Sequence, residues 1–379
     1  MTVPILDLKR SFSEIKPEVC TALERIFSTQ SFILGREVEM FEKHCETYLE
    51  LPKGSCVGCA SGTDALLLAL MAADIRPGDE VITTPFTFFA TSGTIARLGG
   101  VPVFADVDPV SYNIDLASAM SKITSKTKVF LPVHLFGQMC ALEEVIPQLH
   151  AKGIKVIEDA AQAFGACRRV GDELTRAGCV GDIGCYSFFP TKNLGGCGDG
   201  GMIVAKDPQT AERLRRLRVH GSGKTYYHDE IGINSRLDAL QAAILDIKLR
   251  HLDEWNEQRR RAAEYYKLLF KAEGLHEFVS IPEEMPGNIH IWHQYVVRVK
   301  DKRDELMTYL EECGLSVRVY YPLSLHLQPC FRYLGYHEGD FPVSEKLTRE
   351  VMALPIYPGL KQEEQEELVK GMKEFFTKG

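Results

Sequence analysis

The sequence has no long hydrophobic run and no excess of basic residues. Its most apolar stretch, residues 65–73, is far shorter than the ~20 residues that a membrane-spanning helix needs, so we expect no membrane partner. The 44 basic and 52 acidic residues leave a net charge of −8, which gives no general attraction to nucleic acid or to anionic lipid. Any phosphate group that the protein binds must therefore be held by local geometry.

Cysteine shows no pattern that predicts disulfides or a metal site. The 11 cysteines are an odd number spread over a long chain, which favours a reducing compartment over a disulfide scaffold. Cys56 and Cys59 form the only C-x-x-C pair, and without a second pair no zinc site is predicted. The opening residues, MTVPILDLKRSF, lack a charged leader followed by an apolar run. We therefore expect a cytoplasmic protein that binds no metal.

Strand and helix patterns alternate between residue 54 and about residue 205. This alternation predicts βαβ crossovers, and hence an α/β fold with a mostly parallel sheet between helices. One long helical pattern over residues 234–261 leads to a second region, in which QYVVRV and LSVRVYY predict strands on either side of a helix. We predict a large domain over residues 1–250, with a helical N-terminal segment, and a smaller C-terminal α/β domain over residues 251–379.

Lys192 has unusual neighbours for a lysine. It lies in the segment CYSFFPTKNLGGCGDGG, after an apolar run and before a cluster of glycines. Glycines allow the backbone to approach a ligand closely, and a lysine held there can lose its hydration. Desolvation lowers the pKa of a lysine and frees its amine to form a Schiff base. A solvated surface charge is the competing interpretation for any single lysine.

Two other places are candidate ligand contacts. Asp159 ends the strand-like run VIED, and Ser61-Gly62-Thr63 follows the first predicted strand. Ligands gather at the carboxyl ends of strands in open α/β sheets. The Asp159 carboxylate suits a protonated ring nitrogen of a pyridine-type cofactor. The amides and hydroxyls of residues 61–63, at a helix N-terminus, suit a phosphate. Helix N-capping is the alternative role for Asp159 and for Ser61.

Seven segments, in order along the chain, resemble one known family. They are SGTDAL, TPFTFFATSGTI, VFADVD, VIEDAAQAFGA, SFFPTKNLGGCGDGG, HG…YYH…GINSRLDALQAAIL and YYPLSLHLQP. Together they resemble the DegT/DnrJ/StrS family over nearly the whole chain. These proteins are fold-type I, pyridoxal-phosphate-dependent aminotransferases that act on nucleotide-linked keto-sugars. The resemblance therefore implies an enzyme with pyridoxal 5′-phosphate as its cofactor and pyridoxamine 5′-phosphate as the alternate form.

The resemblance also implies roles for individual residues around the cofactor. Lys192 matches the catalytic lysine that binds the cofactor and later moves a proton, and Asp159 matches the partner of the pyridine nitrogen. Gln162 matches the residue near the ring hydroxyl. Phe88 matches the aromatic side chain that stacks on the ring, although a core position is its alternative. The residues that match the phosphate cup are Gly62, Thr63 and Ser187.

Three more residues are implied in subunit contacts or substrate binding. Asn234 matches a phosphate ligand that the other subunit contributes, so the resemblance implies a homodimer with shared active sites. Arg236 is a candidate for binding a carboxylate of the substrate or the amino donor, because a guanidinium binds it in a bidentate manner. Tyr320-Tyr321-Pro322 stands where relatives often have His-Tyr-Pro. We therefore expect a substrate contact from Tyr321 only.

The implied reaction moves an amino group from L-glutamate to a nucleotide-linked keto-sugar and releases 2-oxoglutarate. Its product would enter amino-sugar and polysaccharide biosynthesis, such as that of lipopolysaccharide. Some relatives carry histidine at the lysine position and dehydrate sugars, so Lys192 favours transamination. The GINSRLD segment resembles enzymes that act at C3 of a UDP- or dTDP-linked 3-keto-sugar. The alternatives are amination at C4 and a non-catalytic, regulatory protein that keeps the cofactor-binding fold.

Overall fold

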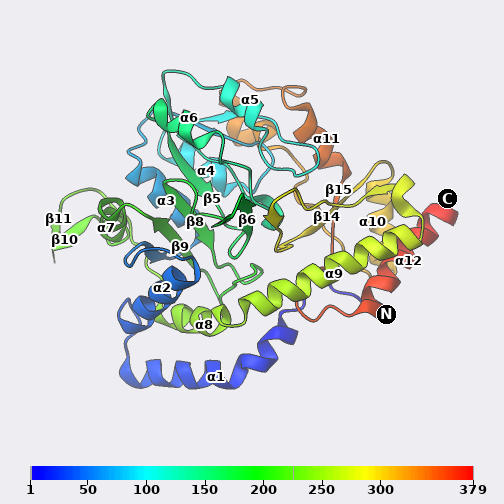
Figure 1. Ribbon diagram of the computed structural model, residues 1–379, viewed down its shortest axis with the longest axis horizontal. Helices are drawn as coiled ribbons and strands as arrows, with labels where there is room; N and C mark the ends of the chain where they lie inside the picture. The colour runs from blue at the N-terminus through cyan, green and yellow to red at the C-terminus, as the bar shows by residue number, and fades with distance from the viewer. Residues whose placement is uncertain (1, 225, 379) are drawn as a thin grey trace.

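The central feature of the protein is a seven-stranded sheet, seen in a computed structural model that describes residues 2–224 and 226–378 (Figure 1). Its strands alternate with helices, as the sequence pattern predicts. The strands lie in the order β1 (Cys56–Cys59), β9 (Gly201–Ala205), β8 (Ile183–Ser187), β5 (Lys155–Asp159), β4 (Thr127–Phe130), β2 (Glu80–Thr83) and β3 (Val101–Phe104).

The sheet is mainly parallel. Strands β3, β2, β4, β5 and β8 are joined by parallel ladders, whereas β9 pairs antiparallel with both β8 and β1. Strand β1 consequently runs in the same direction as the parallel strands. The carboxyl ends of six strands therefore meet at one edge, together with the start of β9. The predicted α/β class with a mostly parallel sheet is confirmed.

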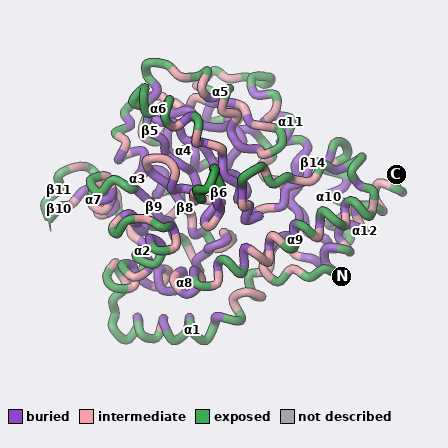
Figure 2. The backbone as a smooth tube through the Cα atoms, in the orientation of Figure 1, coloured by how far each residue is buried: buried purple, intermediate pink, exposed green. Residues whose placement is uncertain are grey.

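Helices cover both faces of this sheet. On one face, α3 (Gly62–Ala72), α4 (Ala90–Arg97) and α7 (Pro208–Leu217) enclose an apolar core. On the other face, α2 (Arg36–Tyr48) and α8 (Ala239–Leu249) pack on one part of the sheet, while α5 (Leu116–Ser121) and α6 (Ile146–Ala151) pack on another. Neighbouring β9 residues alternate between the two faces, since Ile203 belongs to the first core and Met202 to the second. Figure 2 shows the buried residues concentrated along these central elements.

The predicted long helix over residues 234–261 is in fact two helices. Residues 234–238 are not helical, because Asn234 pairs with Val219 and Asp238 pairs with Ile33 in isolated bridges. Helix α8 starts only at Ala239, and α9 (Leu252–Ala272) follows after a short break. The N-terminal helix α1 (Leu8–Thr29) lies along α8 (Figure 1).

A second, smaller body surrounds a three-stranded sheet of β12 (Val279–Ser280), β14 (Tyr295–Val299) and β15 (Val351–Leu354). Its core also includes residues of α9, of α10 (Arg303–Glu312) and of α12 (Gln362–Lys378). The predicted strand over residues 315–321 is wrong as a regular strand, because only Leu315 and Arg318 form isolated bridges there. Its apolar side chains nevertheless enter the core as the alternation predicts.

The remaining elements connect or extend the two bodies. Strand β13 (Asn288–Ile289) pairs with β6 (Cys167–Val170), which pairs with β7 (Glu173–Arg176). The hairpin of β10 (Ser222–Lys224) and β11 (Tyr227–His228) projects at the end of the molecule opposite α12 (Figure 1). Helix α11 (Pro342–Glu350) precedes β15. We propose, as the sequence does, a division near residue 250. No helix among residues 2–224 and 226–378 is long and apolar enough to span a membrane.

Candidate active site

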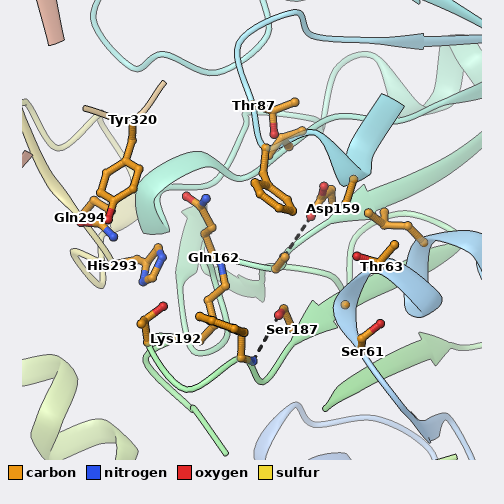
Figure 3. A pocket seen from close by; sticks show the side chains of 18 of the residues that line it. Ser61, Thr63, Thr87, Asp159, Gln162, Ser187, Lys192, His293, Gln294 and Tyr320 are labelled. Carbon is orange, nitrogen blue, oxygen red and sulfur yellow. Dashed lines mark hydrogen bonds between the residues drawn. The ribbon is translucent and has the colours of Figure 1, made fainter. Parts of the chain in front are cut away.

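A cavity of about 690 Å³ lies at the edge where the parallel strands end. Eight of the ten residues that the sequence assigns to a site line it (Figure 3). They come from five separate parts of the chain because the βαβ topology brings strand ends together. The eight residues are Gly62, Thr63, Phe88, Asp159, Gln162, Ser187, Lys192 and Tyr321.

Lys192 lies in the loop after β8, where its backbone N–H donates to the Phe189 carbonyl at 2.8 Å. Burial lowers the pKa of its amine from 10.5 to about 8, against the opposing effect of the Asp159 charge. The favoured form at neutral pH is still the ammonium, but the free amine is accessible there. A fully solvated lysine, the competing interpretation, does not fit this placement.

The glycines that follow Lys192 have a different role from the one predicted. A Cβ at Gly195 would collide with the Pro190 carbonyl, and one at Gly196 would lie 2.8 Å from Oε1 of Gln241. The glycines therefore let the loop fold tightly on itself and on α8. They fix the path of the lysine loop, and the expected close approach of their backbone to a ligand is not what the packing requires.

Asp159 is buried at the carboxyl end of β5. Its Oδ2 accepts a hydrogen bond from Oγ1 of Thr91 at 2.8 Å, and its Oδ1 accepts one from the backbone N–H of Ala161 at 3.2 Å. Burial raises the pKa of this carboxyl despite these donors. The next element after β5 is strand β6, so the alternative role as a helix cap is wrong. A buried carboxylate with few donors is stabilised by a cation placed against it.

The N-terminus of α3 forms another wall of the cavity. Ser61 caps this helix by accepting a hydrogen bond from the Asp64 N–H at 3.1 Å, so the capping interpretation is confirmed for Ser61. Gly62 packs directly on Ser187, since a Cβ at position 62 would lie 2.5 Å from Cβ of Ser187. This packing brings the positive end of α3, with Thr63, to the end of β8. Such a helix end favours a bound anion.

Gln162 and Tyr321 are held to each other across the cavity. Oε1 of Gln162 accepts from the Phe136 N–H at 2.8 Å, and its Nε2 donates to the Tyr321 hydroxyl at 3.0 Å. Burial raises the pKa of this hydroxyl, which stays protonated. The ring of Phe88 lies 6.4 Å from the ring of Tyr321. Because Phe88 is 58% exposed and lines the cavity, the alternative of a core phenylalanine is wrong.

Asn234 and Arg236 do not line this cavity. Asn234 is exposed and forms a backbone bridge with Val219, while Arg236 is half-buried. Ser235 between them is buried and ties the segment to the α3 entrance: its Oγ donates to Oδ2 of Asp64 at 2.8 Å and accepts from the Ala60 N–H at 3.1 Å. A role for Asn234 in a second subunit and a role for Arg236 in binding a carboxylate both stay predictions.

Sequence reasoning missed several residues at the cavity. Thr87 lines it and shares a hydrogen bond of 3.1 Å with Thr91, which in turn holds Asp159. The hydroxyl spacing in TPFTFFATS was the available signal, since residues 87 and 91 are one helical turn apart. His293 also lines the cavity. The histidine-rich run HIHIWH had been passed over as ordinary strand sequence.

The comparisons with known proteins agree with this geometry. A sequence model of the DegT/DnrJ/EryC1/StrS aminotransferase family matches residues 13–373. The chain belongs to this family. It is 41% identical to a UDP-N-acetyl-3-dehydro-alpha-D-glucosamine 3-aminotransferase of Acidithiobacillus ferrooxidans, over 96% of this chain and 95% of the relative. It is also 49% identical to a pleiotropic regulatory protein of Geobacillus stearothermophilus, over 99% of each chain.

Solved structures of the DegT/DnrJ/EryC1/StrS family share the fold. DesV of S. venezuelae, determined in complex with a ketimine intermediate, matches with a TM-score of 0.93 and 36% identity, over 99% of this chain and 98% of that chain. The predicted fold-type I architecture and the predicted family are therefore both confirmed.

Proposed function

We propose that this aminotransferase transfers the amino group of L-glutamate to C3 of a keto-sugar linked to UDP or dTDP. Relatives of both nucleotide classes support the C3 position. One is named a UDP-2-acetamido-2-deoxy-3-oxo-D-glucuronate aminotransferase from Pseudomonas aeruginosa. Another, from Aneurinibacillus thermoaerophilus, is named a dTDP-3-amino-3,6-dideoxy-alpha-D-galactopyranose transaminase. The choice between UDP and dTDP stays open in this proposal.

One observation carries the enzymatic part of the proposal. A desolvated lysine amine and a buried carboxylate, Lys192 and Asp159, face the same cavity. A binding protein needs neither an amine whose pKa is lowered to about 8 nor a place for it beside a ligand. A proton-transfer catalyst needs both, because a catalytic pKa near the working pH makes the proton easy to accept and to return.

Pyridoxal phosphate is the cofactor, and the residues present fit it. The cradle between α3 and β8, formed by Gly62, Thr63 and Ser187, suits a phosphate group because it offers a helix N-terminus and hydroxyls. Asp159 suits a protonated ring nitrogen, for the cation would compensate its burial. Phe88 provides an exposed aromatic face. When bound, the cofactor supplies an electron sink that stabilises negative charge on the substrate carbon.

The chain's own contribution to the chemistry is positioning and proton transfer. The Nζ atom of Lys192 takes a proton from the carbon that carries the amino group and returns it at the acceptor position. Asp159 stays ionised and oriented through its bonds to Thr91 and to the Ala161 N–H. Gln162 and Tyr321 form a fixed polar wall opposite the lysine loop.

The proposed homodimer has active sites that two subunits share. Asn234 is exposed and outside its own chain's cavity, as a residue that serves a partner's site has to be. Mixing Lys192→Ala with Asn234→Ala under conditions of subunit exchange tests the arrangement. Hybrid dimers then contain one intact site, so activity should return to about a quarter of the wild-type value. Persistent inactivity of the mixture, with exchange verified, contradicts a shared site.

Absorbance and mass spectrometry test the function itself. Glutamate should bleach the cofactor absorbance and release 2-oxoglutarate, and borohydride should fix the cofactor on Lys192. The reverse reaction, run on a panel of UDP- and dTDP-linked amino sugars with 2-oxoglutarate, identifies the acceptor. Deamination of 3-amino sugars supports the proposal. Deamination restricted to 4-amino sugars replaces it with amination at C4.

A regulatory role is the second candidate, and the Geobacillus relative favours it. A regulator of this fold would bind the cofactor but would not turn over an amino donor. Cofactor absorbance that neither glutamate nor any other amino acid changes would support this alternative. The lowered pKa of Lys192 argues for the enzyme, because a regulator gains nothing from an accessible free amine.

A further inference from the structure

His293 lines the cavity beside Lys192 and has no part in the chemistry described so far. It lies between β13 and β14, in the segment that joins the two bodies. Figure 3 shows its ring facing the cavity from the side of Lys192 and Gln294. Its backbone is fixed, since the carbonyls of Trp292 and His293 accept from NH1 of the buried Arg259 at 3.2 and 3.4 Å.

The hydrogen bonds of Asn193 determine which ring nitrogen of His293 carries a proton. Nδ2 of Asn193 lies 3.0 Å from the Ile291 carbonyl and 2.7 Å from Oδ1 of Asn256. A backbone carbonyl can only accept, so this end of Asn193 must be the NH₂ group. Its Oδ1, an acceptor, then lies 3.1 Å from Nδ1 of His293. Nδ1 must therefore be the donor, which leaves Nε2 without a proton in the neutral ring.

The surroundings of His293 also keep the ring neutral. Burial lowers its pKa well below 6.5, and the positive charges of Lys192 and Arg259 and the neighbouring His290 lower it further. Asn193 offers an amide where a carboxylate would have favoured the imidazolium. Nε2 of His293 is therefore a permanent hydrogen-bond acceptor in a cavity that otherwise holds the carboxylate of Asp159.

We propose that His293 is a positioning residue whose Nε2 accepts a hydrogen bond from the Lys192 amine whenever that amine is not bonded to the cofactor. The proposal rests on the proposed function, because only turnover releases the amine. Within residues 2–224 and 226–378, Nζ of Lys192 has no hydrogen-bond partner of its own. Both oxygens of Asp159 already accept a protein donor. A neutral acceptor directs the amine without retaining its proton, which a carboxylate at the same place would do.

Nitrogen NMR tests the protonation state independently of turnover. In ¹⁵N-histidine-labelled protein loaded with pyridoxamine 5′-phosphate, the signal lost in His293→Gln identifies the ring. We expect a protonated Nδ1 and a bare Nε2 from pH 6 to 8. The Asn193→Asp variant should move the ring toward the imidazolium, because a carboxylate then faces Nδ1–H. A wild-type ring with a protonated Nε2 overturns the proposal.

Kinetics of the glutamate half-reaction test the contact itself. Losing one hydrogen bond to a charged amine should lower kcat by about 10- to 100-fold in His293→Phe, with little change in KM. His293→Gln, which can place an amide oxygen near the position of Nε2, should recover part of that loss. The pH midpoint for condensation of pyridoxal phosphate with the apoprotein should fall in His293→Phe, because the ammonium loses an acceptor.

The outcomes separate this proposal from the proposed function. Wild-type protein that never turns over an amino donor refutes the function, and the NMR result and the condensation midpoint still decide the role of His293. Equal kcat and equal midpoints for wild type and His293→Phe refute the positioning role. If His293→Phe fails to fold, the Asn193→Asp spectrum and the His293→Gln kinetics give the same decision.

Discussion

The amine of Lys192 should react with pyridoxal phosphate near neutral pH, and Asp159 should control the pH at which it does so. Burial lowers the pKa of Lys192 from 10.5 to about 8, and the Asp159 charge opposes part of that change. Replacing Asp159 by Asn removes the opposing charge and keeps the size of the side chain. The pKa of Lys192 should therefore fall further in Asp159→Asn, although a charge that stabilises the loaded cofactor is lost.

The structure gives the size of the effect in the wild-type protein. With a pKa of about 8, roughly one amine in ten is free base at pH 7, whereas an ordinary lysine has roughly one in 3,000. The difference is about 300-fold in reactive amine at that pH. Below the midpoint the condensation rate should rise about tenfold per pH unit, and above it the rate should level off.

Stopped-flow absorbance after mixing apoprotein with pyridoxal phosphate measures this rate between pH 6 and 10. Lys192→Ala gives the baseline, because it removes the amine. Asp64→Asn is a matched control, since Asp64 bonds to Ser235 outside the cavity lining and should leave the midpoint in place. A wild-type midpoint near 10.5, or an upward shift in Asp159→Asn, would refute the reasoning about burial and charge.

Three further substitutions test the walls of the site. Gly62→Ala should cost ~1–3 kcal/mol and weaken cofactor binding, because its Cβ meets Ser187 at 2.5 Å; thermal melts with and without cofactor measure both, and Ser187→Gly should relieve part of the loss. Thr91→Val should weaken cofactor binding about 3- to 10-fold by releasing Asp159, and Thr91→Ser should restore it in a spectroscopic titration. Glu158→Gln should cost ~3 kcal/mol near pH 7 in denaturant unfolding; equal midpoints for variant and wild type would contradict that.

The Glu158 prediction carries a pH dependence of known sign. Burial alone would raise the pKa of this carboxyl, but hydrogen bonds from His134 and from the Gly181 and Gly178 N–H groups hold it below its usual 4.5. A carboxyl with a lowered folded pKa contributes its stability above its unfolded pKa and loses it as the pH falls. The gap between wild type and Glu158→Gln should therefore narrow below about pH 4.5. A gap that widens in acid would contradict the assignment.

Much of the fold could be predicted because its strands are short, apolar and separated by helical patterns. The break between α8 and α9 could not, since no glycine or proline stands at Arg250 and His251. There the His251 N–H bonds to the Lys248 carbonyl three residues back, and the His251 ring stacks on Trp255 at 5.5 Å. Such a tight turn depends on tertiary packing, which local periodicity does not report.

The non-helical start of that segment has a similar cause. Residues 234–238 carry the helical spacing of apolar residues, yet the Ser235 N–H bonds to the Arg218 carbonyl and the Ala239 N–H bonds to the Phe32 carbonyl. These are long-range backbone contacts with segments far away in sequence. They hold Asn234 in an extended stretch, and the helix forms only after them.

The candidate site was predictable where chemistry and position coincide. Lys192 and Asp159 stand out because a charged residue at the end of an apolar strand needs a reason to be there. Thr91 and His293 were missed, because a threonine or a histidine in apolar sequence has many structural uses. Their importance appears only when a hydrogen bond to Asp159 or a place in the cavity is seen.

The position of the reactive amine depends on both bodies of the protein. Asn193, directly after Lys192, donates to Asn256 on α9 and to the Ile291 carbonyl, which precedes β14. Helix α9 contributes side chains to the core of the second body, and its start also reaches the core of the large sheet, through Leu252. A movement between the two bodies would therefore pull on the residue next to Lys192. Because transamination tolerates little displacement of the amine, the second body acts as part of the support that holds it.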